Sequence, residues 1–487
     1  MITEAALADF RAVAGPQALI EDPDLIAPWL SDWRDKYHGR SVAMLAPRST
    51  EQVSAMMKVA RKHGVPLVPQ GGNSSMVGGA TPPADGSALI LSLRAMNRIR
   101  SLDAQANLAV CEAGVILSTL HDAAAVAGRR FPLSLGAKGS ATVGGLVSTN
   151  AGGTQVLRHG TMRALVEGIE AVLPDGEIYD GIAALKKDNR GYDLKQLLIG
   201  AEGTLGIVTA ASLRLVPGVA DRCVAWVGVT DPEQALALLR RLEATLGPVV
   251  EGFEVLENNT VEFVLGAVPG TRRPIETRAP WQALIEIDLD DSAEGPSAHE
   301  RMETALSEAF GAGLILDAAI AANEAQAEAF WKIRETAPEG ERAQGPALQF
   351  DISVPIADMP RFMVHVAADC EARFAGATAG SFGHLGDGNV HFHLRAPMGE
   401  GADAARAWIV SHGEAATHFV NDAVAAAGGS ISAEHGIGQM KIREFQRLGA
   451  PAQINAVRAI KHALDPLGLL NPGKLVPPGT VPLAPAK

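Results

Sequence analysis

The chain has little of several features that mark particular classes of protein. Only three of its 487 residues are cysteine, Cys111, Cys223 and Cys370. They are too few and too scattered for a disulfide framework or a paired-cysteine metal site, which favours a reducing compartment. No run of about 18 or more apolar residues occurs, so we expect no membrane-spanning segment. Lysine and arginine (42) are outnumbered by aspartate and glutamate (55), and the net charge of −13 disfavours nucleic acid and anionic membranes as partners.

The remaining composition is that of an ordinary globular protein. Apolar residues make up 47% of the chain and charged residues 20%. The length exceeds what one core accommodates, so two or three domains are expected. The first ten residues, MITEAALADF, are acidic where a secretion signal is basic. We therefore expect no signal peptide and a cytoplasmic protein.

Residues 380–393, GSFGHLGDGNVHFH, hold the densest group of chemically active side chains. Their glycines favour a tight turn, and the VHFHL that follows is typical of a strand. On a strand His391 and His393 share one face, while His384 lies across the turn. This arrangement favours a metal site or an acid–base site. Three ordinary surface histidines are the alternative.

A second polar cluster lies at residues 432–441, SAEHGIGQMK. Glu434 supplies a carboxylate and His435 an imidazole, which suit a divalent metal and a general base. Neighbouring residues of an extended chain point opposite ways, so both can serve one site only if the backbone turns. Gly436 and Gly438 make such a turn feasible. An ordinary helix start with glutamate in its first turn is the alternative.

Two glycine-rich loops stand out in the first half of the chain. From Ser41 the pattern is strand, helix, strand, and it runs into GGNSSMVGG at residues 71–79. Exposed backbone N–H groups in such a loop can cradle phosphate, although an ordinary turn has the same composition. PLSLGAKGSATVGGLVSTNAGG, from Pro132, contains more small residues than one turn requires. No GxGxxG motif joins a strand to a helix, so a Rossmann nicotinamide site is not expected.

The same patterns predict four parts of the chain. Residues 1–40 form a lead-in with one helix, and residues 41–218 form the glycine-loop domain. Residues 219–425 alternate amphipathic helices with strands, as in an α/β domain. Residues 426–487 form a C-terminal segment.

Six motifs occur together and in a familiar order. They are PQGGNSSMVGG, PLSLGAKGSATVGGLVSTNAGG, KKDNRGYDLKQLLIGAEGTLGIVT, GHLGDGNVHFH, SAEHGIGQMK and DPLGLLNPGK. With them the chain resembles the FAD-linked D-2-hydroxy acid dehydrogenases of the vanillyl-alcohol oxidase superfamily. The second and third motifs are most similar to D-2-hydroxyglutarate dehydrogenases, and D-lactate dehydrogenases are the next nearest.

The resemblance implies an α+β protein with a two-subdomain FAD-binding domain of the vanillyl-alcohol oxidase type. A ferredoxin-like α/β cap domain would hold the substrate, and a C-terminal helical segment would return to the flavin. Asn73 stands where covalently flavinylated relatives commonly carry histidine, so we expect non-covalent FAD. The implied flavin contacts are Gly71, Gly72, Asn73, Ser74, Ser75, Gly136, Ser140, Thr142, Gly145, Asn150, Glu202, Gly206, Val208 and Asn471.

The resemblance also implies the catalytic groups. His384, His391 and Glu434 match the ligands of a divalent metal, zinc or manganese, and His435 matches the catalytic base. Arg334 resembles the arginine that clamps the substrate carboxylate, a role that suits a planar guanidinium. Without the family, a helix-surface partner is the simpler interpretation of Arg334.

The implied reaction is hydride transfer from a D-2-hydroxy acid, D-2-hydroxyglutarate or a similar acid, to FAD. Electrons would then pass to an electron-transfer flavoprotein or a quinone, and the protein would be a homodimer. The alternatives are a D-lactate dehydrogenase, an oxygen-using oxidase of another α-hydroxy acid or alcohol, and a flavoprotein that has lost catalysis.

Three residues depart from the 2-hydroxyglutarate pattern. Gln349 replaces a usual lysine that contacts a substrate carboxylate, which weakens the case for a dianionic substrate. Pro338 stands where those enzymes tend to have a hydroxyl residue. His393 stands where they tend to have asparagine, and it is a further candidate base or substrate contact.

Overall fold

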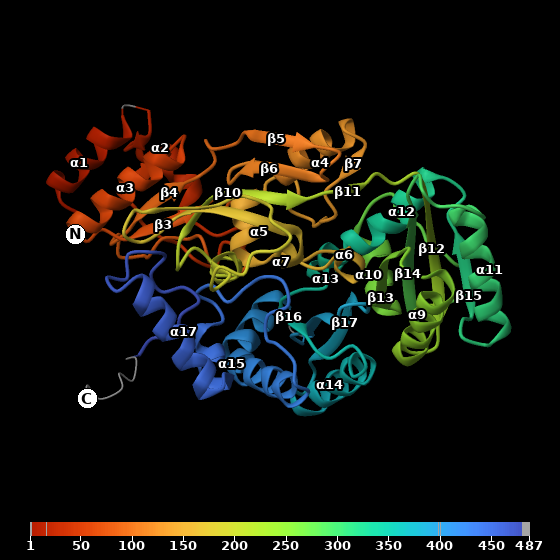
Figure 1. The fold of residues 1–487 in the computed structure, drawn as a ribbon. Helices are drawn as coiled ribbons and strands as arrows, with labels where there is room; N and C mark the ends of the chain where they lie inside the picture. The colour runs from red at the N-terminus through yellow and green to blue at the C-terminus, as the bar shows by residue number, and fades with distance from the viewer. Residues whose placement is uncertain (1, 16, 398, 400, 480–487) are drawn as a thin grey trace. The chain divides into compact units, whose positions relative to one another are not determined.

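The computed structural model describes residues 2–15, 17–397, 399 and 401–479 (Figure 1). The chain divides into two compact units. Unit 1 contains Met1–Gly152, Gly160–Pro217 and Glu434–Lys487, and unit 2 contains Gly153–His159 and Gly218–Ala433. The N-terminal lead-in thus belongs to unit 1. Among the described residues, no helix combines the length and apolar character needed to cross a membrane.

Unit 1 contains a small, mainly parallel sheet with strand order β1-β2-β4-β3. Its strands are β1 (Leu19–Ile20), β2 (Met44–Leu45), β3 (Leu67–Gln70) and β4 (Leu89–Ser92). The expected strand–helix–strand unit is confirmed, because α3 (Thr50–His63) connects β2 to β3. The Ser49 side chain accepts from the Gln52 N–H to cap α3, and Gly64, in the left-handed region, ends it.

A second, antiparallel sheet of unit 1 has strand order β5-β6-β10-β8-β9. Its strands are β5 (Ile99–Asp103), β6 (Leu108–Glu112), β8 (Val166–Val172), β9 (Ile178–Gly181) and β10 (Ile207–Arg214). Other elements of unit 1 are α1 (Glu4–Ala14), α2 (Pro23–Ile26), η1 (Ala27–Trp29), α4 (Leu117–Val126), β7 (Arg129–Arg130), α5 (Val143–Thr149), α7 (Met162–Leu165), α8 (Leu194–Leu198), β11 (Val216–Pro217), α16 (Ile442–Leu448) and α17 (Pro451–Leu464).

Unit 2 is built on one antiparallel sheet of seven strands, in the order β15-β12-β14-β13-β17-β18-β16. Its strands are β12 (Asp221–Val229), β13 (Val250–Glu257), β14 (Trp281–Leu289), β15 (Asp317–Ile320), β16 (Ala347–Ser353), β17 (Thr378–His384) and β18 (Asn389–Arg395). Its helices are α6 (Val156–His159), α9 (Pro232–Leu246), α10 (Asn258–Ala267), α11 (Ala298–Gly311), α12 (Glu324–Glu335), α13 (Ala337–Ala343), α14 (Met359–Arg373) and α15 (Ala402–Ala426).

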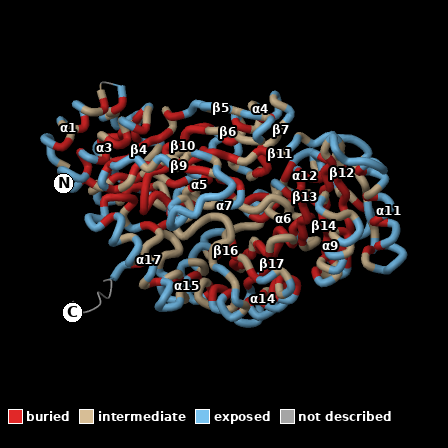
Figure 2. Tube along the Cα trace, in the orientation of Figure 1, coloured by how far each residue is buried: buried red, intermediate tan, exposed pale blue. Residues whose placement is uncertain are grey.

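The first half of unit 2 is ferredoxin-like. Apart from α10, which is inserted between β13 and β14, the chain runs β12–α9–β13–β14–α11–β15, and these strands lie in the order β15-β12-β14-β13. Strands β17, β18 and β16 extend the sheet beyond β13. Helices α9, α11, α14 and α15 pack their apolar side chains into the main core on one face, and α10 and α12 pack on the other. Most of the length of these strands is buried (Figure 2).

Strand β18 confirms the alternation expected from VHFHL. Val390, Phe392 and Leu394 are fully buried in the main core of unit 2. Residues 389, 391, 393 and 395 therefore face the other side of the sheet. This places His391 and His393 on one polar face, in register with side chains of β16 and β17.

Candidate active site

The β17–β18 hairpin positions two of the expected metal ligands. His384 is the last residue of β17, and His391 lies on β18, with 5.6 Å between their ring centroids. The turn between them folds back tightly, since the Gly388 N–H donates to the His384 carbonyl at 3.1 Å. Gly388 has φ +83°, and a Cβ there would lie 2.2 Å from the Val354 carbonyl oxygen. Only glycine fits this turn.

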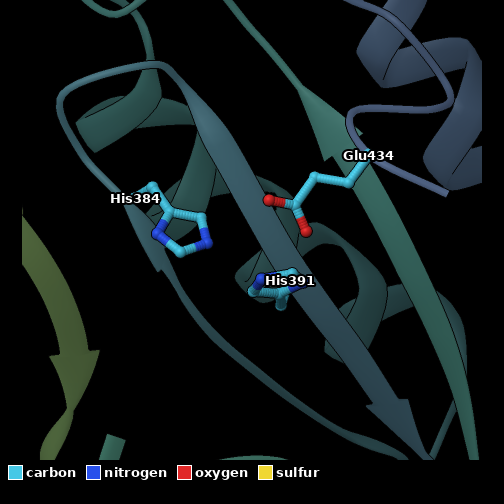
Figure 3. Close-up of side chains that lie close together, drawn as sticks. All are labelled: His384, His391 and Glu434. Atoms are coloured by element: carbon cyan, nitrogen blue, oxygen red, sulfur yellow. The ribbon is translucent and has the colours of Figure 1, made fainter. Parts of the chain in front are cut away.

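Glu434 joins these two histidines. Each of the three residues offers one ligand atom, and these atoms lie within 4.8 Å of one another. Figure 3 shows the Glu434 carboxylate turned toward the two imidazoles. Glu434 directly follows Ala433, whose N–H donates to the Asp351 carbonyl on β16 at 3.3 Å. Two imidazoles and one carboxylate form a ligand set typical of catalytic zinc, so the residues fit a divalent metal.

A second trio shares Glu434. Ligand atoms of Asp351, Glu434 and His435 also lie within 4.8 Å of one another. Asp351 is buried and pairs directly with His391 in the β16–β18 register. Its carboxylate accepts from the Asn389 amide at 3.1 Å. Asp351 is absent from the residues expected from sequence, although it lies only two positions after Gln349.

Arg334 and His384 meet at a second buried carboxylate. The Arg334 Nε donates to Glu254 Oε2 at 2.6 Å, and His384 Nδ1 lies 2.5 Å from Glu254 Oε1. Burial would raise the pKa of the Glu254 carboxyl, but attraction to Arg334 and His384 outweighs burial and holds this pKa below its ordinary value. Arg334 Nη2 lies 3.4 Å from His384 Nε2, so the expected carboxylate clamp stands beside an expected metal ligand.

His393 lies farther along the same face of β18. Its Nδ1 is 3.3 Å from Glu341 Oε2, and Arg395 donates to the same carboxylate oxygen. Burial would raise the pKa of Glu341, but its interactions with His393 and Arg395 lower it. Gln349 is directly opposite His393 in the β16–β18 register. Pro338 lies in the first turn of α13.

The two glycine-rich loops pack against each other inside unit 1. A Cβ on Gly71 would lie 2.1 Å from Thr142 Oγ1, and a Cβ on Gly72 would lie 1.8 Å from the Ser140 carbonyl oxygen. The loops can approach so closely only because these residues are glycine. The buried Thr142 Oγ1 has no hydrogen-bond partner among the described residues. The same holds for Asn471 Oδ1, so polar atoms here fit a polar ligand such as FAD.

Asn471 and Glu202, two expected flavin contacts, also hold the backbone of unit 1 together. The Asn471 Nδ2 donates to the carbonyl oxygens of Gly79 at 2.9 Å and Glu202 at 2.7 Å. The Glu202 carboxylate accepts from the N–H groups of Ile437 and Gly438, each at 2.7 Å. Burial raises the pKa of Glu202. Glu202 thus fixes the loop that immediately follows His435.

The other expected flavin contacts occupy loops and element ends of unit 1. Asn73 and Asn150 have positive φ, and Thr142 and Asn150 are the N-cap and C-cap residues of α5. The Asn73 amide donates to the Ser31 carbonyl at 2.8 Å, and Ser75 Oγ accepts from the Gly79 N–H at 3.0 Å. Ser74, Gly136, Ser140, Gly145, Gly206 and Val208 complete the set.

Two family models match the chain. A model described as FAD binding domain matches residues 42–181, and one described as FAD linked oxidases, C-terminal domain, matches residues 219–475. The crystal structure of p-cresol methylhydroxylase shares the fold, with a TM-score of 0.73 at 15% identity, covering 97% of this chain and 97% of that one. The two matching domains define an FAD-dependent oxidoreductase.

Closer relatives define the family. The mitochondrial D-2-hydroxyglutarate dehydrogenase of Arabidopsis thaliana is 36% identical over 96% of this chain and 81% of its own length. The mitochondrial D-2-hydroxyglutarate dehydrogenase of Bos taurus is 34% identical over 98% of this chain and 84% of its own. The chain belongs to the FAD-linked D-2-hydroxy acid dehydrogenases, as its motifs predicted.

Proposed function

We propose that the chain oxidises D-2-hydroxyglutarate or a similar D-2-hydroxy acid to the 2-oxo acid with the help of a divalent metal, zinc or manganese. The observation that carries this proposal is the convergence of His384, His391 and Glu434 on one point beside the buried Arg334. A flavoprotein without catalysis has no use for metal ligands beside a carboxylate clamp.

The side chains have distinct roles in this reaction. Bound FAD supplies the hydride acceptor, and a divalent ion on the three ligands supplies Lewis acidity that favours loss of the hydroxyl proton. Arg334 holds the substrate carboxylate. Its Nη2 is 3.4 Å from His384 Nε2, so a carboxylate held by Arg334 would lie beside the proposed metal ligands. His435 accepts the hydroxyl proton, and Glu202 keeps the adjoining loop in place.

A monocarboxylic acid such as D-lactate is the second candidate substrate. Gln349, opposite His393, is a neutral amide, and Glu341 places a carboxylate behind that histidine. These groups offer no free cation to a second substrate carboxylate. We further propose an electron-transfer flavoprotein or a quinone as electron acceptor, a homodimeric state and a cytoplasmic location.

The test is the anaerobic visible spectrum of the purified protein before and after each candidate acid. We expect a non-covalent flavin spectrum that one D-acid among 2-hydroxyglutarate, lactate and malate bleaches and its L-isomer does not. Prior removal of metal with EDTA should slow the bleaching, and zinc or manganese should restore it. Peroxide formation in air would indicate an oxidase, and failure of every D-acid to bleach the flavin would reject the proposal.

A further inference from the structure

Glu254 is a fully buried carboxylate in unit 2. It lies on β13, directly opposite His384 in the β13–β17 register, and its relative exposure is 0%. A buried carboxylate is costly unless charged or hydrogen-bonded groups compensate it. Here Arg334 and His384 provide that compensation.

The two oxygens of Glu254 serve different partners. Oε2 accepts from the Arg334 Nε at 2.6 Å, and Oε1 lies 2.5 Å from His384 Nδ1. An ionised carboxylate can only accept hydrogen bonds, so His384 carries its proton on Nδ1 and presents the lone pair of Nε2. A carboxylate that fixes a ligating histidine in this way commonly raises metal affinity.

The same contact orients the guanidinium. With Nε bonded to Glu254, Arg334 Nη2 lies 3.4 Å from His384 Nε2. The Phe382 ring lies beneath the guanidinium, 4.9 Å from ring centroid to Cζ. The contacts of Glu254 with Arg334 and with His384 therefore fix the distance between the guanidinium and the imidazole.

We propose that Glu254 is a positioning residue that fixes His384 for the metal and Arg334 for the substrate carboxylate at one spacing. This inference rests on the proposed function and adds a residue that touches neither substrate nor cofactor. A purely structural ion pair would affect folding alone. A positioning residue also controls metal affinity and substrate binding in protein that remains folded.

The test compares Glu254→Gln with Glu257→Gln in the FAD-loaded protein. Glutamine keeps the shape of the glutamate side chain but has one acceptor oxygen. Arg334 and His384 each need their own oxygen of residue 254. Glu257 is a matched control on the same strand, because it is partly buried and accepts from the N–H and Oγ of Ser381 rather than from the site. After metal removal, Co²⁺ is titrated by its visible absorption, and KM and kcat are measured with the D-acid that bleaches the flavin.

We expect Glu254→Gln to weaken Co²⁺ binding by about ten-fold or more and to raise KM by a similar factor, with the flavin spectrum unchanged. Glu257→Gln should leave both constants within about two-fold of the parent. Folded Glu254→Gln protein with parental Co²⁺ affinity and KM would overturn the proposal.

Glu254→Asp covers the case in which the glutamine variant does not fold. Aspartate keeps the charge that neutralises Arg334 but is one methylene shorter, so it cannot reach both partners. We expect it to weaken Co²⁺ binding or raise KM, and parental values of both would contradict the inference. The Co²⁺ titration needs no turnover, so it still decides the role of Glu254 at the metal if no D-acid is a substrate and the proposed function fails.

Discussion

Replacement of Glu257 by glutamine should stabilise the protein in a pH-dependent way. Glu257 ends β13, and its carboxyl accepts from the N–H of Ser381 at 3.0 Å. Burial raises the pKa of this carboxyl from 4.5 to about 7, even though the bonds from Ser381 and the attraction of Arg395 oppose the rise. The folded protein therefore favours the neutral acid, and ionisation of Glu257 destabilises it.

The size of the effect follows from linkage. A carboxyl with a raised folded-state pKa contributes stability that is full below its unfolded pKa and is lost as the pH rises through the folded value. Here the loss runs between about pH 4.5 and 7. One pKa unit corresponds to about 1.4 kcal/mol, so the penalty at pH 8 is roughly 3 kcal/mol and at pH 5 below about 1 kcal/mol. An amide is neutral throughout and can still accept from Ser381.

Urea denaturation of both proteins with saturating FAD, followed by tryptophan fluorescence at several pH values, measures this effect. Subtracting one curve of unfolding free energy against pH from the other removes the contributions of all titrating groups that the two proteins share. We expect the advantage of Glu257→Gln to grow by roughly 2–3 kcal/mol between pH 5 and pH 8. A difference that stays flat over this range would refute the raised pKa.

Three further changes test other parts of the proposed site. His435→Ala should lower kcat by a factor of about 10² or more while FAD stays bound, and unchanged turnover in stopped-flow reduction would remove His435 as the base. Gln349→Lys should lower KM for D-2-hydroxyglutarate more than for D-lactate, and a ratio of KM values equal to the parent's would show that residue 349 does not contact the distal carboxylate. Asn471→Asp replaces a donor facing two carbonyl oxygens by an acceptor, so thermal or urea unfolding should show a loss of about 2–3 kcal/mol; parental stability would contradict these bonds.

Local patterns in the sequence predicted the parts of the site that one short segment builds. The alternation in VHFHL placed His391 and His393 on one face, because a strand fixes side-chain direction by a period of two. The glycine content of the preceding stretch predicted the turn, and Gly388 has the positive φ that such a turn requires. The family motifs predicted the FAD domain and the reaction class, which the family models and relatives bear out.

The sequence could not predict Glu254 or Asp351, because their roles depend on strand pairing over long sequence separations. Glu254 reaches His384 only because β13 pairs with β17, and the two residues are 130 positions apart. Within EGFEVLE the glutamates recur every third residue, which does not match the period of two of a half-exposed strand, and the strand is almost entirely buried. Burying the Glu254 carboxylate is costly without partners, so its role became clear only when the structure placed Arg334 and His384 beside it.

The C-terminal segment explains how two adjacent residues can serve one site. Glu434 contributes to both trios, and His435 joins the second, because the backbone bends at residues 433–435 and does not run extended. Gly436 and Gly438 both have positive φ. A Cβ on Gly436 would lie 2.7 Å from Glu202 Oε1, and a Cβ on Gly438 would lie 2.3 Å from the Val77 carbonyl oxygen. The turn is therefore packed against the first glycine loop and against Glu202. The position of His435, the proposed base, is consequently set by loop packing within unit 1, the unit that contains the FAD-binding domain.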